Sequence, residues 1–336
     1  MKKRNLDFDI LRVGAILYIV AIRHIGDYLP NINTKNEITA LFMQCALGLF
    51  VYISGLLLSK RYDLSDMSKI IHFLMLRFLR VYPLFLIALT AFCFLGIEDF
   101  SMFTKTAFLT TMILNQRFLT LWFVTMICLF YLILPFYLIN YKLYRAIILT
   151  LAVYSALFII HRLFGLIDLR LAQYLIPFAF GIICARSPKF LTRLYKKTTS
   201  IIAVLLWIVA VLIASKLEGG IQIFAKDFVI IASIPISLII AKMLSKVINH
   251  KLIRMLSYAS YCIYLMHRII FELALLVYRP ENLYVSILYI YLIVLPTIVF
   301  VSYWLQYTYD LALGKLMLRL RLYARRATSY GVSASS

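Results

Sequence analysis

A series of apolar blocks, each about 20 residues long and separated by short polar connectors, runs along this chain. A helix of about that length spans the hydrocarbon core of a bilayer. Hydrophobic residues make up 64% of the 336 residues and charged residues only 15%, whereas soluble domains are about half apolar and a quarter charged. We therefore predict an all-α, polytopic transmembrane helix bundle. About ten spans are expected, near residues 8–26, 38–59, 81–97, 119–139, 145–161, 170–185, 199–215, 227–245, 255–277 and 283–305.

The connectors are too short to hold a soluble domain, so residues 1–305 are predicted to form one integral membrane domain. Residues 306–326 are both basic and apolar, which is typical of an interfacial helix on the anionic lipids of the inner leaflet. Residues 327–336 are predicted to lack regular structure. The start of the chain looks like a signal peptide, but its internal charges and the missing small-residue cleavage site favour a retained first span.

The distribution of Lys and Arg predicts how the chain is oriented. Most of the 35 Lys and Arg residues lie in connectors that face the cytoplasm if the N-terminus is inside, in line with the positive-inside rule. We expect a multi-pass protein of a bacterial-type plasma (inner) membrane with both termini in the cytoplasm. The net charge of +21 is then mostly a topology signal, and no nucleic-acid partner is expected.

The cysteine pattern bears on metal and disulfide chemistry. The five cysteines are isolated within apolar blocks, and none forms a CxxC pair. Such spacing supports neither a zinc site nor a disulfide framework. We therefore expect small core residues at these positions and no metal.

Residues 10–28 read ILRVGAILYIVAIRHIGDY, an apolar run that contains Arg12, Arg23 and His24. A charge at mid-membrane costs about 2.5–3.5 kcal/mol, so it usually faces a cavity or a partner. The alternative is that these side chains only reach the two membrane interfaces. At about 100° per residue, a step of 11 residues returns to within about 20° of its starting direction, and a step of 12 lands about 120° away. Either a one-residue π-bulge near Gly14 brings His24 into line with Arg12, or the helix is regular and Arg23 is the aligned cation.

A second polar group lies where the third span is expected to enter the membrane from the cytoplasm. Arg77 and Arg80 are three residues apart, so they are neighbours on one helix face. Pro83 is expected to start or bend this span. Paired arginines suit a phosphate or another multiply charged anion. Ordinary positive-inside anchoring is the alternative interpretation.

A third polar group lies in the outer half of the ninth span. Arg268 and Glu272 are four residues apart and are predicted to form an ion pair on one helix face. Tyr264 lies three residues before His267, on the same side of the helix. His267 is either a functional residue or a core histidine whose hydrogen bonds are satisfied.

Taken in order, these elements resemble the membrane-bound acyltransferase-3 family, whose members acylate bacterial surface polysaccharides and related glycans. The resemblance runs from the first to the ninth span and so covers most of the chain. It rests on six stretches: DILRVGAILYIVAIRH with Arg12 and His24; FVYISGLLLSKRY with Ser54 and Gly55; LRFLRVYP with Arg77, Arg80, Tyr82 and Pro83; LWFVTMICLFYLILP with Trp122, Tyr131 and Pro135; YLIPFAFGIICAR; and SYCIYLMH, which ends in His267.

The resemblance implies transfer of an acyl group, usually acetyl, from cytoplasmic acyl-CoA to a hydroxyl of a cell-surface or membrane-linked glycan. By the resemblance, the family's essential Arg and His map to Arg12 and His24, and its paired arginines map to Arg77 and Arg80. The CoA phosphates need a cationic site, and Arg77 and Arg80, with Tyr82 of the same element, are expected on the cytoplasmic side where CoA resides. Acetyl-CoA is therefore the expected co-substrate. The expected partners are acyl-CoA, a glycan acceptor and membrane lipid.

Three departures from the family pattern matter. Many members carry carboxylates shortly after the Leu-Trp pair, whereas this chain reads TMICL at residues 125–129. Some members append an extracytoplasmic esterase-like domain, which is not expected here. The family usually has ten residues between the Arg and the His of the first span, whereas eleven separate Arg12 from His24.

The chemistry of acyl transfer suggests a role for each candidate. His24 is the predicted general base because histidine accepts a proton near neutral pH, with His267 as second choice or helper. An oxyanion at the thioester carbonyl needs a donor, which could be Arg12, Tyr264 or a backbone amide. Ser54 and Trp122 join the candidate site through the family elements. The alternative function is a glycan-lipid flippase or transporter, which would also need buried polar groups.

Overall fold

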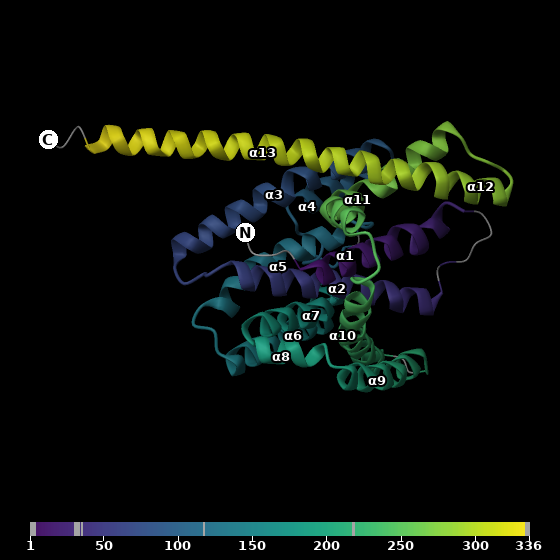
Figure 1. Ribbon diagram of the computed structural model, residues 1–336, viewed down its shortest axis with the longest axis horizontal. Helices are drawn as coiled ribbons and strands as arrows, with labels where there is room; N and C mark the ends of the chain where they lie inside the picture. Colours follow the sequence, from purple (N-terminus) through teal and green to yellow (C-terminus); the bar gives the residue numbers. More distant parts are fainter. Residues whose placement is uncertain (1–4, 30–33, 35, 117, 217–218, 333–336) are drawn as a thin grey trace.

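The computed structural model describes residues 5–29, 34, 36–116, 118–216 and 219–332, and every regular element in these ranges is a helix (Figure 1). The elements of the N-terminal half are α1 (Leu6–Tyr18), η1 (Ile19–Arg23), η2 (Ile25–Asp27), α2 (Glu37–Arg61), α3 (Met67–Phe94), η3 (Phe100–Met102), α4 (Phe103–Ala107), α5 (Trp122–Leu138) and α6 (Leu143–Phe164). Those of the C-terminal half are α7 (Leu169–Arg186), α8 (Pro188–Leu194), α9 (Lys197–Lys216), α10 (Gly219–Leu244), α11 (His250–Val277), α12 (Leu283–Tyr289), η4 (Ile290–Val294) and α13 (Leu295–Val332).

The predicted helical membrane bundle is confirmed in its class. Within the described ranges, 8 helices are long and apolar enough to cross a membrane, and α5 is a shorter apolar helix. The first predicted span corresponds to α1 continued by η1, in which the regular α-helix covers 13 residues. Each of the ten predicted blocks therefore contains helix, while the count of ten spans and the cytoplasmic position of both termini stay predictions.

The third helix begins much earlier than the sequence pattern indicates. α3 starts at Met67 because the Asp66 side chain caps it by accepting a hydrogen bond from the Lys69 backbone N–H at 2.9 Å. The helix then runs without a break through Pro83. Of the two alternatives for Pro83, the one in which it starts this span was therefore wrong, and the position of Arg77 at the membrane entry stays a prediction.

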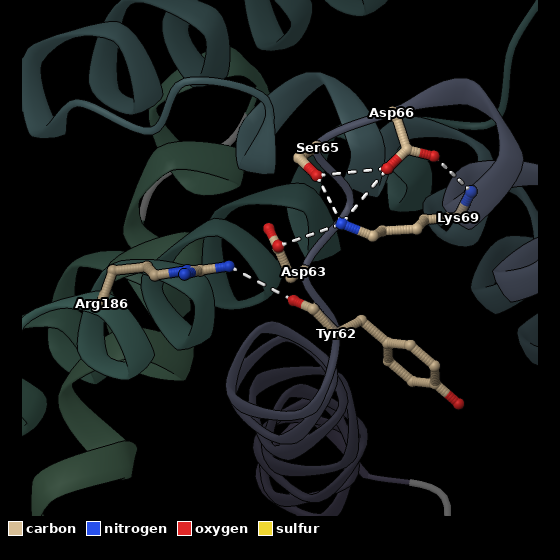
Figure 2. A network of polar contacts seen from close by, with 6 residues as sticks. All are labelled: Tyr62, Asp63, Ser65, Asp66, Lys69 and Arg186. Carbon is tan, nitrogen blue, oxygen red and sulfur yellow. Dashed lines mark hydrogen bonds and ion pairs between the residues drawn. The ribbon is translucent and has the colours of Figure 1, made fainter.

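The connection between α2 and α3 is tied together by polar contacts (Figure 2). Lys69 Nζ lies 2.8 Å from the Ser65 hydroxyl, 3.2 Å from Asp66 and 3.5 Å from Asp63. Arg186, at the end of α7, donates to the Tyr62 carbonyl at 3.3 Å. The backbone N–H that Asp66 caps lowers the pKa of that carboxyl. These contacts hold the ends of α2, α3 and α7 together.

Two glycines allow α2 and α7 to cross at close range. A Cβ added to Gly55 would lie 2.3 Å from the Phe178 carbonyl oxygen, and one added to Gly181 would lie 2.2 Å from the Tyr52 carbonyl oxygen. Only residues without a side chain permit such an approach of two backbones. The crossing fixes the position of Ser54, which precedes Gly55 in α2.

α13 is one continuous helix that extends beyond the rest of the bundle at its C-terminal end (Figure 1). It runs without a break across residue 305, where the sequence predicts the boundary between membrane domain and interfacial segment. It also continues to Val332, into the stretch 327–336 for which no regular structure was predicted. Residues 333–336 lie outside the described residues.

Candidate functional site

The first helix changes its winding just before His24. Over η1 the chain forms a π-helical turn, in which the His24 backbone N–H donates to the Ile19 carbonyl, five residues back, at 3.0 Å. A π-turn accommodates one residue more than an α-turn, so it compensates for the twelve-residue step from Arg12. Of the two alternatives, the one with a π-bulge is therefore present, but the bulge follows α1, whereas Gly14 lies within regular α-helix.

Side chains from other segments satisfy the carbonyls at the end of this first helix. The Tyr291 hydroxyl donates to the Ala21 carbonyl at 2.7 Å, and the Thr34 hydroxyl donates to the Arg23 carbonyl at 3.1 Å. The last carbonyls of a helix have no partner within the helix, so such bonds stabilise its end. They support the altered winding that sets the direction of His24.

His24 meets His267 of α11 inside the bundle. His24 Nδ1 lies 2.8 Å from His267 Nε2, and the two rings are nearly parallel, with an interplanar angle of 8°. Both side chains are buried, with 4% and 0% of their surfaces exposed. The two histidines named by sequence reasoning, 243 positions apart, thus form a direct contact.

The backbone of α11 determines which nitrogens of this pair carry protons. His267 Nδ1 lies 2.8 Å from the Tyr264 carbonyl and 3.2 Å from the Ile263 carbonyl. A carbonyl can only accept, so we assign the proton of neutral His267 to Nδ1, which leaves its Nε2 as an acceptor. His24 must then donate from Nδ1, and the basic nitrogen of neutral His24 is Nε2. The pair is therefore oriented, with His24 as its proton-accepting end.

Arg268 pairs with a residue that the helix spacing did not indicate. Its Nη2 lies 3.0 Å from Asp27 Oδ2, and 9% of the Arg268 side chain and 16% of the Asp27 side chain are exposed. The predicted Arg268–Glu272 pair is not formed between these two described residues, so that prediction was wrong. Asp27 comes from η2, and the stacking of Tyr28 on Phe271 at 4.5 Å brings this segment against α11.

A cavity of about 470 Å³ lies among α1, α2, α3, α5, α11 and α13. Four arginines line it, and their guanidinium groups make it strongly cationic. The remaining lining combines hydroxyls and aromatic rings with apolar side chains. Its polar and charged lining residues are Arg12, Ser54, Arg61, Arg77, Arg80, Tyr131, Ser257, Tyr258, Ser260, Tyr261, Tyr264, Gln306 and Asp310. We call it the arginine cavity.

Arg77 is held in this cavity by aromatic residues. Its Nη2 donates to the Tyr62 hydroxyl at 2.9 Å, and its guanidinium carbon lies 5.2 Å from the Tyr62 ring centre and 6.0 Å from that of Tyr131. Cation–π contacts of this kind orient a guanidinium without neutralising it. Arg80, one turn further along α3, is exposed and lines the same cavity. The two arginines can therefore present their planar donor groups to one anion.

Tyr264 connects the arginine cavity to the histidine pair. Its side chain lines the cavity, while its carbonyl accepts the His267 Nδ1 proton and its ring centre lies 6.0 Å from that of His267. The Tyr264 hydroxyl donates to the Thr120 carbonyl at 2.5 Å. Among the described residues, His24 and His267 do not line the cavity themselves, so the pair lies just beyond its Tyr264 end.

The remaining predicted residues separate into two groups. Ser54 lines the arginine cavity, as its place beside the α2–α7 crossing allows. Tyr82 instead donates to the Ala107 carbonyl at 2.8 Å and stacks on Phe78 at 4.3 Å. Trp122 lies beneath the Arg170 guanidinium, at 3.9 Å from the ring centre. Neither aromatic residue is part of the described cavity lining.

Several polar residues of this region were not among the predicted site residues. Asp9 is buried and accepts a hydrogen bond from the Ser257 hydroxyl at 2.6 Å, which ties α1 to α11. Its position one turn before Arg12 on α1 was the available signal. Gln306 and Asp310 lie on α13, beyond the six stretches that carry the resemblance, so no motif indicated them.

A second, larger hollow lies between α9 and α10 and has a volume of about 520 Å³. Its lining is apolar except for Thr199, so it offers no charged group for anion binding or proton transfer. Among the described residues, no group of three or more His, Cys, Asp or Glu side chains could hold a metal ion. The arginine cavity with the adjoining histidine pair is therefore the candidate site.

Comparison with known proteins gives one positive result. A family model described as an acyltransferase domain, that of the acyltransferase-3 family, matches residues 5–307. Comparisons with curated proteins and with solved structures gave no match. The matched range begins just before α1, ends at Tyr307 in the first half of α13, and includes all the predicted site residues.

Proposed function

The chain belongs to the acyltransferase-3 family and is a multi-pass membrane acyltransferase, and from this premise we propose its donor, its acceptor class and its reaction. The donor is acyl-CoA, in the first place acetyl-CoA, taken from the cytoplasm. The acceptor is a hydroxyl of a cell-surface or lipid-linked glycan, and the membrane is a bacterial plasma membrane. The observation that carries this proposal is the adjacency of a four-arginine cavity and a buried histidine pair.

The arginine cavity supports the assignment of the donor. The nucleotide end of CoA carries a diphosphate and a further phosphate, and arginine binds phosphate oxygens through paired N–H donors. Arg77 and Arg80 lie on α3, and Arg61 approaches from α2. The pantetheine arm would then extend toward Tyr264, because the histidine pair lies beyond that end of the cavity.

The histidine pair supports the assignment of the base. His24 Nε2 takes the proton of the glycan hydroxyl, and the hydroxyl oxygen attacks the thioester carbonyl carbon. The imidazolium that forms on His24 keeps its Nδ1–H bonded to His267 Nε2, whose orientation the α11 carbonyls hold. The C–S bond then breaks, the acyl oxygen ester forms, and the proton on His24 passes to the departing CoA sulfur.

A tetrahedral oxyanion forms in this reaction and needs a positively charged or N–H donor. Arg12 is our candidate, since it lines the cavity from the same helix that carries His24 into the bundle. The Tyr264 hydroxyl already donates to the Thr120 carbonyl, which makes this tyrosine less suited to the task. We therefore propose that Tyr264 forms the wall along which the acyl group approaches.

The decisive experiment is acyl transfer by the purified protein. Detergent-solubilised protein is incubated with radiolabelled acetyl-CoA and a panel of lipid-linked and free glycans, and alkali-labile label on the glycan is measured. We expect label on at least one acceptor and none without protein. A deletion strain gives the second test: loss of glycan O-acetyl esters with normal glycan export supports the enzyme, whereas loss of export with unchanged esters supports the flippase alternative.

A further inference from the structure

One wall of the arginine cavity carries hydrogen-bond acceptors in place of cationic side chains. Gln306 and Asp310, four positions apart on α13, line the cavity together with Tyr258 of α11. Within the described lining, Asp310 is the only carboxylate, in a cavity that otherwise carries four arginines. It also lies beyond residue 307, where the match to the family ends. A carboxylate in a site for a polyanion therefore needs an explanation from this chain's own structure.

The Asp310 carboxylate is held in place by neutral groups. The Tyr258 hydroxyl donates to Asp310 Oδ2 at 2.7 Å, and the Gln306 amide donates to Asp310 Oδ1 at 3.2 Å. Gln306 is itself oriented, because its Oε1 accepts from the Cys262 thiol at 3.3 Å. An ionised carboxylate has about four acceptor positions. Each oxygen therefore keeps acceptor capacity after these two bonds.

A contact between α13 and α3 places this carboxylate beside the arginines. The Tyr309 hydroxyl donates to the Leu79 carbonyl, and these two residues are the chain neighbours of Asp310 and Arg80. Tyr258 lies six residues before Tyr264 on α11, a rise of about 9 Å. Asp310 is therefore at the end of the cavity away from Tyr264 and the histidine pair, where the nucleotide end of the donor would lie.

The charge of this wall restricts what can bind there. A carboxylate repels phosphate, so the phosphates of the donor are expected on the arginine side. The group facing Asp310 must be uncharged or cationic and must carry an N–H or O–H donor. At the nucleotide end of acyl-CoA, the ribose hydroxyl adjoins a phosphate, whereas the exocyclic amino group of adenine is an uncharged donor away from the phosphates.

We propose that Asp310, held by Tyr258 and Gln306, accepts a hydrogen bond from the adenine amino group of the donor and so makes the enzyme selective for the base. This assignment rests on the proposed function, in which acyl-CoA occupies the arginine cavity. It adds a specificity residue from α13, outside the range that the family match covers. Donors with the same phosphates but another base are bound less tightly.

The test compares CoA with an analogue whose adenine is replaced by hypoxanthine, which carries a carbonyl oxygen in place of the amino group. Affinities for the purified protein in detergent are measured by calorimetry. Wild type is expected to bind CoA roughly tenfold or more tightly than the analogue, since a hydrogen bond to a charged group is lost and two acceptors then face each other. Asp310→Asn, whose amide can also donate, is expected to reduce this ratio to about twofold or less.

Two further variants keep the test decisive. Tyr258→Phe removes the hydroxyl that orients Asp310 and is expected to lower the ratio with little change in folding. Glu281→Gln neutralises an exposed carboxylate outside the cavity lining and is expected to leave the ratio unchanged. If Asp310→Asn does not fold, the Tyr258→Phe ratio decides.

Equal affinity of the wild type for CoA and the analogue overturns the proposal. An affinity ratio that stays at the wild-type value in Asp310→Asn also overturns it. If Asp310→Asn does not fold, an unchanged ratio in Tyr258→Phe has the same consequence. Failure of both ligands to bind overturns it together with the proposed donor. Selective binding of CoA without acyl transfer to any glycan leaves the adenine assignment standing and contradicts the proposed reaction. The binding ratio thus separates the two claims.

Discussion

The histidine pair shows at the level of single residues what the sequence could and could not predict. Both His24 and His267 were recognisable as polar residues in apolar blocks. Their 2.8 Å contact and the direction of its hydrogen bond depend on α1 packing against α11 and on two carbonyls of α11. Such information belongs to tertiary structure, so sequence reasoning could name the residues but could not orient them.

A prediction on donor binding concerns Arg77 and Arg80, which are proposed to bind the CoA phosphates. Arg77→Ala and Arg80→Ala are each expected to raise the KM for acetyl-CoA roughly tenfold or more with little change in kcat, because each removes charge-assisted hydrogen bonds to phosphate. Arg77→Lys is expected to recover only part of the loss, since an ammonium lacks the planar fork. Initial rates at varied acetyl-CoA concentration provide the measurement.

The matched control for these variants is Arg254→Ala, which removes an exposed cation from α11 outside the cavity lining. Its KM for acetyl-CoA should stay within about twofold of the wild-type value, because exposed charges contribute little. An unchanged KM in Arg77→Ala, or an equal rise in Arg254→Ala, would show that the phosphates bind elsewhere.

The ion pair of Arg268 gives a prediction on stability. Asp27→Asn leaves the largely buried guanidinium without its carboxylate and is expected to cost up to about 3 kcal/mol. Glu272→Gln, at the position that helix spacing indicated, is expected to change stability by no more than about 0.5 kcal/mol. Thermal unfolding in detergent compares the two. Equal effects of the two variants would contradict the pairing seen in the structure.

At the level of elements, the π-turn of η1 explains the extra residue in the first span. The sequence alone showed that a regular helix would not place His24 in line with Arg12, because this depends only on helix periodicity. It could not place the solution, since the position of the turn depends on the partners of the helix end, among them Tyr291 and Thr34. The same limit applies to the start of α3, which its N-cap sets outside the apolar block.

Deleting Ile22, an exposed residue of η1, tests the π-turn. The deletion shortens the step from Arg12 to His24 to eleven residues, so a regular α-helix keeps His24 in line, and activity is expected to stay within about tenfold of wild type. Inserting one alanine after Ile22 turns His24 by about 100° and is expected to lower kcat at least about 100-fold. Both activities are measured on protein that unfolds near the wild-type temperature.

The opposite ranking, with the insertion active and the deletion inactive, would contradict the proposal that the π-turn of η1 aligns His24 with Arg12. A loss of equal size in two well-folded variants would show that length alone, and not phase, matters at this position.

For the whole molecule, hydropathy predicted the class and the approximate position of the helices because a bilayer imposes both length and composition on a spanning segment. The arginine cavity could not be predicted in the same way. Residues of six helices line it, and two of them, Gln306 and Asp310, come from α13. The sequence pattern divides this helix between a span and an interfacial segment. Which helices meet is set by close crossings such as that of Gly55 and Gly181, which no periodicity reveals.

We propose that this membrane acyltransferase separates donor binding at the arginine cavity from proton transfer at His24. The most direct test measures acetyl transfer and CoA affinity together on purified wild type and His24→Ala. We expect His24→Ala to lose at least about 100-fold in kcat while its affinity for CoA stays within about twofold of wild type. Wild-type transfer by His24→Ala, or a loss explained entirely by weaker CoA binding, would contradict the account.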